Sequence, residues 1–191
     1  MNHKMELKKA SRRKDNLTPE EIKKMFQDLK GNAEAKGLLA TLLLTGCRIS
    51  EALLLKFKDI YTDENWIYFR MVVLKYRNNK KPIILKKIPK SNPLVPFILY
   101  YYNNTDNPRI ANNIIFEKSR QSYSKIFKKI NPLFNPHLCR KYLATKLSEK
   151  IDVYDLRDWF HWSSIRHSEP YVLRKPSINR VANLYNKVDL I

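Results

Sequence analysis

His137 and Arg140 stand three residues apart in the segment Asn135–Thr145, NPHLCRKYLAT. Pro136 favours a helix that begins here, because the missing N–H of a proline is no loss in the first turn. At this spacing both side chains leave the same face of the turn, close to free backbone N–H groups. Arginine offers forked donors to phosphate, and histidine holds or passes a proton near neutral pH. The segment predicts an anion site, whereas in isolation it would indicate only a surface arginine beside a packed histidine.

The chain has a large surplus of positive charge. Its 191 residues include 37 lysines and arginines against 18 aspartates and glutamates, a formal net charge of +19. A hydrophobic share of 43% excludes wholesale disorder. Such a surplus in one domain favours a nucleic acid over a membrane or a metabolite as partner, although part of it is explained by a lysine-rich solvated surface.

The rest of the composition indicates a cytoplasmic protein. Cys47 and Cys139 lie in apolar or motif-bearing stretches, which is typical of small core residues in a reducing compartment. Residues 1–16 form a basic, aperiodic arm without the apolar region of a secretion signal. Apolar runs stay below the length of about 18 residues that a membrane span needs. We expect a folded body over residues 17–191 and no membrane association.

The apolar periodicity predicts an α+β fold, mainly α-helical, with a small antiparallel β-hairpin. Thr18 and Pro19 open the first helix as N-cap and first helical residue. β-Branched and aromatic residues on both sides of an Asn-rich turn predict the hairpin over residues 66–89. Further helices are expected over residues 33–44, from Ser50 onward, and over 95–102, 122–130, 135–150 and 153–160, with a tail helix from Ser177.

Arg48 lies just after Gly46, at the junction between two expected helices. A glycine at such a junction lets backbone and side chain approach a ligand closely. The alternative is that Arg48 pairs with Glu51 and pins the turn, and the two roles are compatible.

Three segments in this order resemble the catalytic domain of the tyrosine recombinase (phage integrase) family. LLLTGCRISEALLLKFKDI resembles the first box of that family, with Arg48 as its first arginine and Glu51 as the buried acidic partner. PHLCRKYLAT resembles the second box, PHxLRHxxAT, which contains His137 and Arg140. Lys141 departs from it, since a second histidine is common there.

DWFHWSSIRHSEPYV resembles the third box of the family. The register of its SSI places Trp162 at the His/Trp position and Tyr171 at the nucleophile, with the neighbouring His161 as the alternative to Trp162. Lys75 fits the hairpin lysine of the family. Lys80 and Lys81 are the alternatives to it.

The resemblance implies a site-specific recombinase or integrase that cleaves and rejoins double-stranded DNA through a covalent 3′-phosphotyrosyl intermediate. Arg48 and Arg140 would neutralise the phosphorane, so no metal or cofactor is required. The resemblance gives Lys75 the proton transfer to the leaving 5′ hydroxyl and His137 a proton-accepting or phosphate-holding role. Trp162 would donate its indole N–H to a phosphate oxygen.

The resemblance also implies an active tetramer on DNA, in association with the nucleoid. Family members usually carry an N-terminal helical clamp domain, and only the basic arm precedes the catalytic domain here, so we expect a fragment or a minimal recombinase. The alternative functions are a non-catalytic DNA-binding protein with the same fold and a DNA-relaxing enzyme like topoisomerase IB. An RNA-binding basic protein would explain the charge but not the order of the motifs.

Overall fold

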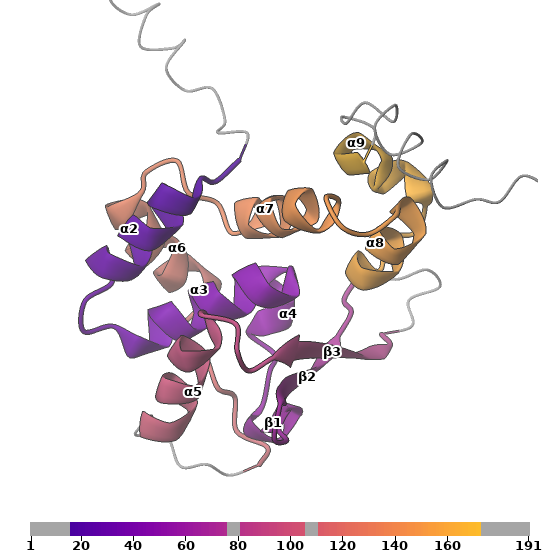
Figure 1. Cartoon of the computed structure of the whole chain (residues 1–191). Coiled ribbons are helices and arrows are strands. Elements are labelled where there is room, and N and C mark those ends of the chain that lie inside the picture. Colours follow the sequence, from indigo (N-terminus) through magenta and orange to yellow (C-terminus); the bar gives the residue numbers. More distant parts are fainter. Residues whose placement is uncertain (1–15, 76–80, 106–110, 173–191) are drawn as a thin grey trace, which may run out of the picture.

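A group of helices packs around one small antiparallel sheet in the computed structural model, which describes residues 16–75, 81–105 and 111–172 (Figure 1). This confirms the predicted α+β, mainly helical fold. The strands are β1 (Ile60–Thr62), β2 (Trp66–Val72) and β3 (Ile83–Pro89). The helices are α2 (Pro19–Asp28), α3 (Ala33–Thr45), α4 (Ile49–Ala52), α5 (Val95–Asn104), α6 (Arg120–Ile130), α7 (His137–Leu147), α8 (Val153–Phe160) and α9 (Glu169–Val172), with the short 3₁₀ helices η1 (Phe57–Asp59) and η3 (Ile165–His167).

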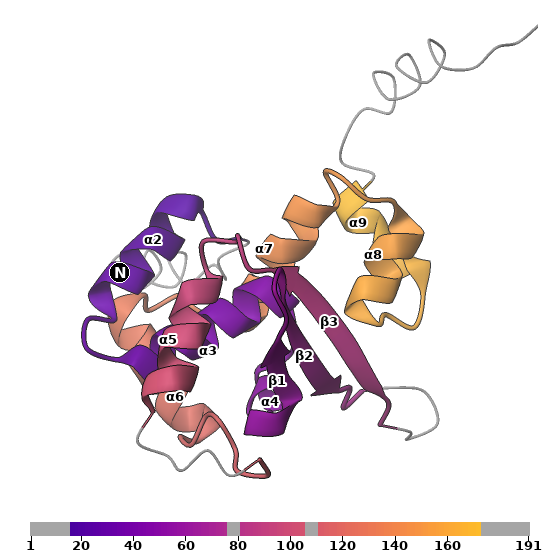
Figure 2. The same ribbon diagram turned by 60° about the horizontal axis from the view of Figure 1, so that its bottom comes forward.

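Helix α3 forms the centre of the hydrophobic core. Its sequence is apolar almost all round, so it has no polar face to turn to water, and nearly all its residues are buried. It packs against α5 and α7 (Figures 1 and 2). The helix ends at Gly46, whose backbone is left-handed with φ of +63°. A side chain there would collide with the ring of Phe160, so the glycine lets α8 approach the end of α3.

The sheet has the order β1-β2-β3, and β2 and β3 form the predicted hairpin. Phe69 on β2 pairs with Lys86 on β3. The inner face of β2 carries Ile67, Phe69 and Met71, which are all buried. Strand β1 was not predicted, because it is only three residues long and is defined by its pairing with β2.

The C-terminal segment packs as a second, smaller cluster. Ala144 on α7 and Leu156 and Phe160 on α8 are its buried members, and Trp162 and Tyr171 pack against them. Figures 1 and 2 show α8 and α9 together at the end of the molecule remote from α2 and α6. Tyr171 is therefore carried by a segment that packs on α7 and that contacts β3 through Trp159 and Lys86.

Several expectations can be compared directly with these residues. Cys47 and Cys139 are buried and free, as predicted for small core residues. In the part of the chain described, no helix has the length and apolar character needed to cross a membrane. The basic arm, apart from Asn16, and the tail helix from Ser177 lie outside the described residues.

Candidate active site

All six residues predicted for the site line one cleft with a volume of about 400 Å³. They come from four separate parts of the chain: the α3–α4 junction, the end of β2, the start of α7 and the C-terminal segment. The predicted lining residues are Arg48, Lys75, His137, Arg140, Trp162 and Tyr171, and they are joined there by His161, Ser163 and His167. The fold thus brings together side chains up to 123 positions apart, from 48 to 171.

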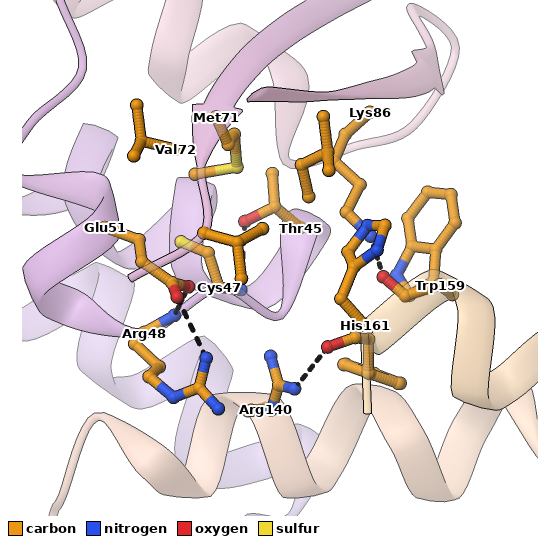
Figure 3. A pocket seen from close by; sticks show the side chains of 13 residues that line it. Thr45, Cys47, Arg48, Glu51, Met71, Val72, Lys86, Arg140, Trp159 and His161 are labelled. Carbon is orange, nitrogen blue, oxygen red and sulfur yellow. Dashed lines mark hydrogen bonds and ion pairs between the residues drawn. The ribbon is translucent and has the colours of Figure 1, made fainter. Parts of the chain in front are cut away.

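Arg140 is held more tightly than the other residues of the cleft. Arg140 is only 5% exposed to solvent. One guanidinium nitrogen donates to the carbonyl of Gly46 and the other to that of Phe160, both at 2.7 Å. The second of these bonds is the dashed line from Arg140 in Figure 3. Burial and the charge of Arg48 lower the pKa of Arg140 to about 10, so it stays charged at neutral pH. The guanidinium therefore joins the end of α3 to the end of α8, and its position is fixed before any ligand binds.

Arg48 is the N-cap residue of α4, and Glu51 is its partner. The buried carboxylate of Glu51 accepts hydrogen bonds from the backbone N–H of Arg48 at 2.8 Å and from its guanidinium at 2.9 Å. It also accepts one from the backbone N–H of Leu74, just after β2, at 3.2 Å. The expected Arg48–Glu51 pair is confirmed, and the same carboxylate ties the arginine to the strand end that carries Lys75.

His137 begins α7, one residue after Pro136, which is the N-cap residue. Partial burial and then the charges of Arg140, Arg48 and Lys141 lower the pKa of His137 below its usual value. The imidazole is therefore neutral at pH 7 and can accept a proton.

Trp162 connects Tyr171 to the core through stacked rings. The centroids of Phe160 and Trp162 are 4.8 Å apart, and those of Trp162 and Tyr171 are 5.6 Å apart with an interplanar angle of 12°. The guanidinium carbon of Arg140 lies 5.5 Å from the Trp162 centroid. These contacts hold the half-buried Tyr171 beside the arginine without enclosing it.

His161 also lines the cleft, so both residues that the sequence left open at the third box lie there. His161 ends α8 with a left-handed backbone, φ of +49°, which is uncommon for a non-glycine residue. Burial and the charges of Lys86 and Arg140 lower its pKa to about 4, so its ring is neutral. Of the two, Trp162 makes the stacking contact with Tyr171.

Lys75 lies just after β2, is exposed, and lines the cleft. Of its two alternatives, Lys80 lies outside the described residues. Lys81 is exposed, and it is not among the described residues that line the cleft.

Lys86 is a functional candidate that the sequence analysis did not identify. It is only 4% exposed, and its ammonium group donates to the carbonyl of Trp159 and lies 4.1 Å from the centroid of the Trp159 ring. Burial and the charge of Arg140 lower its pKa to about 7. Figure 3 shows Lys86 and His161 directed toward the same space beside Trp159.

Lys86 and Arg140 together bind the last two carbonyls of α8, those of Trp159 and Phe160. Cations at a helix C-terminus interact favourably with its unpaired carbonyls. The signal for Lys86 was present in the sequence, because period-2 alternation puts it on the same strand face as Ile84 and the buried Ile88.

Two arginines, a neutral histidine and a tyrosine that converge on one open cleft define a site suited to a phosphodiester. The chain belongs to the phage integrase family, whose model matches residues 15–176. Its fold is that of the tyrosine recombinase catalytic domain. A comparison with curated protein sequences finds no significant match.

Three solved structures show the likeness of fold. The XerH site-specific recombinase in a pre-cleavage complex with difH substrate has 18% sequence identity and a TM-score of 0.63, over 90% of this chain and 53% of XerH. The catalytic domain of bacteriophage HP1 integrase has 18% identity and a TM-score of 0.61, over 91% of this chain and 95% of that domain. The Tn1549 transposon integrase in complex with transposon right end DNA has 18% identity and a TM-score of 0.66, over 90% and 65%. The chain thus spans about half the length of XerH and about two thirds of the Tn1549 integrase chain.

Proposed function

We propose that the protein is a site-specific DNA recombinase or integrase that cleaves and rejoins strands through a 3′-phosphotyrosyl intermediate at Tyr171. The observation that carries the proposal is the convergence of Tyr171 with Arg48, Arg140 and His137 on one cleft. Membership of the phage integrase family supports it.

In the proposed cleavage step the phenolic oxygen of Tyr171 attacks the phosphorus atom, a P–O bond to tyrosine forms, and the P–O5′ bond breaks. The unperturbed pKa of tyrosine is about 10, so the phenol must lose its proton during attack. The neutral His137 accepts this proton, and Lys75 gives one to the leaving 5′ oxygen. Religation is the reverse of these steps, with the 5′ hydroxyl as nucleophile and Tyr171 as leaving group.

The charge that develops on the phosphate is balanced by arginines. Two of the five N–H groups of the Arg140 guanidinium donate to the carbonyls of Gly46 and Phe160. The remaining N–H groups donate to the phosphate. Arg48 binds from the side of α4, and Trp162 donates its indole N–H. Because both arginines are positioned in advance, they stabilise the transition state without reorganisation. The phosphotyrosyl bond stores the energy for rejoining, so the mechanism requires no cofactor.

We extend the proposal to double-stranded DNA as partner and to a tetramer as the active assembly. Exchange between two duplexes requires the cleavage of four strands, and each copy of the chain supplies one Tyr171. Binding should weaken with salt, with a log–log slope near −0.9 for each phosphate contacted.

The proposal is tested by trapping the covalent intermediate. Wild-type protein is mixed with nicked duplexes that carry a library of sequences, denatured, and examined for a DNA adduct. We expect an adduct with the wild type and none with Tyr171→Phe, while Tyr100→Phe, which changes an exposed tyrosine outside the cleft, serves as the matched control. Tight DNA binding without any adduct would instead favour the non-catalytic alternative, and relaxation of supercoiled DNA without recombinant products would favour the topoisomerase-like one.

A further inference from the structure

A second cavity, of about 290 Å³, adjoins the cleft. The two share three lining residues: Arg48, Lys75 and His137. The second cavity adds Arg120 at the start of α6 and the polar residues Ser50 and Asn135. The three shared residues therefore lie between the two spaces.

The second cavity has the chemistry of an anion site. Among the described residues that line it, the charged side chains of Arg48, Lys75 and Arg120 are all cationic. The nearby carboxylate of Glu51 already accepts three hydrogen bonds, two from Arg48 and one from Leu74. Burial first, and then repulsion from the charges of Arg140, Arg48 and Lys141, lowers the pKa of His137. An anion in the cavity would relieve this repulsion.

Tyr171 lines the cleft and does not line the second cavity. The same is true of two residues near it in sequence, Trp162 and His167. In an in-line displacement at phosphorus the leaving oxygen departs opposite the attacking one. A cavity that Tyr171 does not line fits the side of the leaving 5′ oxygen better than the side of attack. Lys75 lines both spaces, as a proton donor to that oxygen should.

We propose that this cavity binds the first phosphate of the leaving strand, the one that joins its first and second nucleotides, with Arg120 as a ligand. Successive phosphates of a strand are about 3.4 Å apart along the duplex axis, so a neighbouring phosphate falls in a space that directly adjoins the cleft. The inference rests on the proposed function. Its consequence is that Arg120 retains the 5′-hydroxyl strand after cleavage and presents it for religation.

The test measures religation from the preformed adduct. Wild-type protein is trapped on a nicked duplex that loses its short leaving strand, and an acceptor strand with a 5′ hydroxyl is then added at increasing concentration. We expect Arg120→Ala to raise the half-saturating acceptor concentration about tenfold, the size expected for one charge-assisted hydrogen bond. Arg120→Lys should give an intermediate value. Lys128→Ala is the matched control, because it removes an exposed charge from the same helix outside both cavities.

A modified acceptor identifies the phosphate. An acceptor with a neutral methylphosphonate at its first linkage should raise the half-saturating concentration for the wild type and cause no further increase for Arg120→Ala. Independent effects of the two changes, or an unaltered concentration for Arg120→Ala, would overturn the inference while leaving the proposed function intact. A wild type that forms no Tyr171-dependent adduct would overturn the proposed function, and this inference with it.

Discussion

The substitution Arg140→Lys separates the shape of this side chain from its charge. The guanidinium donates from two nitrogens to carbonyls on two different segments, those of Gly46 and Phe160, each at 2.7 Å. A lysine ammonium is a single point at the end of a flexible chain and cannot replace both bonds. A hydrogen bond from a charged group contributes roughly 1.5–3 kcal/mol, so the loss of one or both should lower the free energy of unfolding by about 2–5 kcal/mol.

The same change should slow cleavage about 100- to 1000-fold, the usual effect of removing one fixed donor from a transition state. Urea unfolding gives the first quantity, and single-turnover adduct formation, measured where the variant is folded, gives the second. Arg70→Lys, an exposed arginine on β2, is the control and should change stability by less than about 0.5 kcal/mol. The reasoning would be refuted if Arg140→Lys were as stable as this control, or if it cleaved DNA at the wild-type rate.

Three further predictions concern pH, the leaving group and backbone geometry. Lys86 has a pKa of about 7 in the folded protein, against 10.5 for an ordinary lysine, so the folded state binds fewer protons than the unfolded state between these two pH values. The unfolding free energy of the wild type should therefore rise, relative to that of Lys86→Met, by about 1.4 kcal/mol per pH unit above pH 7. This gain is lost as the pH falls through 7. Urea titrations at several pH values measure the difference, and a difference that stays constant with pH would contradict the prediction. Lys75→Ala should slow adduct formation about 10²- to 10⁴-fold, and a 5′-bridging phosphorothiolate, whose sulfur leaves without a proton, should restore the rate; failure of this rescue would remove Lys75 as the acid. Gly46→Ala should cost about 3 kcal/mol in thermal or urea unfolding, from left-handed strain and collision with Phe160. Gly31→Ala, at φ of +74° with no atom within 4 Å among the described residues, should show only the strain, so equal losses would argue against the collision.

The starts of α2, α3, α5 and α8 were predicted correctly, because local chemistry determines them, whereas α6 and α7 each start two residues away from the expected position. The side chain of Thr18 accepts from the backbone N–H of Glu21, the Glu21 side chain accepts from Thr18 in return, and Pro19 follows, as expected for a capped helix. Helix α8 begins and ends where predicted, at Val153 and Phe160, after Asp152 as N-cap. Strand β1 was missed since its three residues carry no periodicity of their own and are defined only by pairing with β2.

For the site, the resemblance supplied the residues and the fold supplied their arrangement. The six predicted side chains line one cleft, but their catalytic roles stay predictions. The two carbonyl bonds of Arg140 and the bond of Lys86 to the Trp159 carbonyl could not be predicted, because they depend on how the end of α8 packs against α3 and β3. In local sequence Lys86 is one of several hairpin lysines, and only its position on the inner strand face distinguishes it.

The central claim, that Tyr171 is the nucleophile, is tested most directly by identifying the modified residue. The chain contains 11 tyrosines, so an adduct alone does not assign the attacking group. The trapped adduct is digested with protease and nuclease, and the nucleotide-bearing peptide is sequenced by mass spectrometry. The account predicts a single modified peptide with the phosphonucleotide on Tyr171. Attachment to any other residue would contradict it.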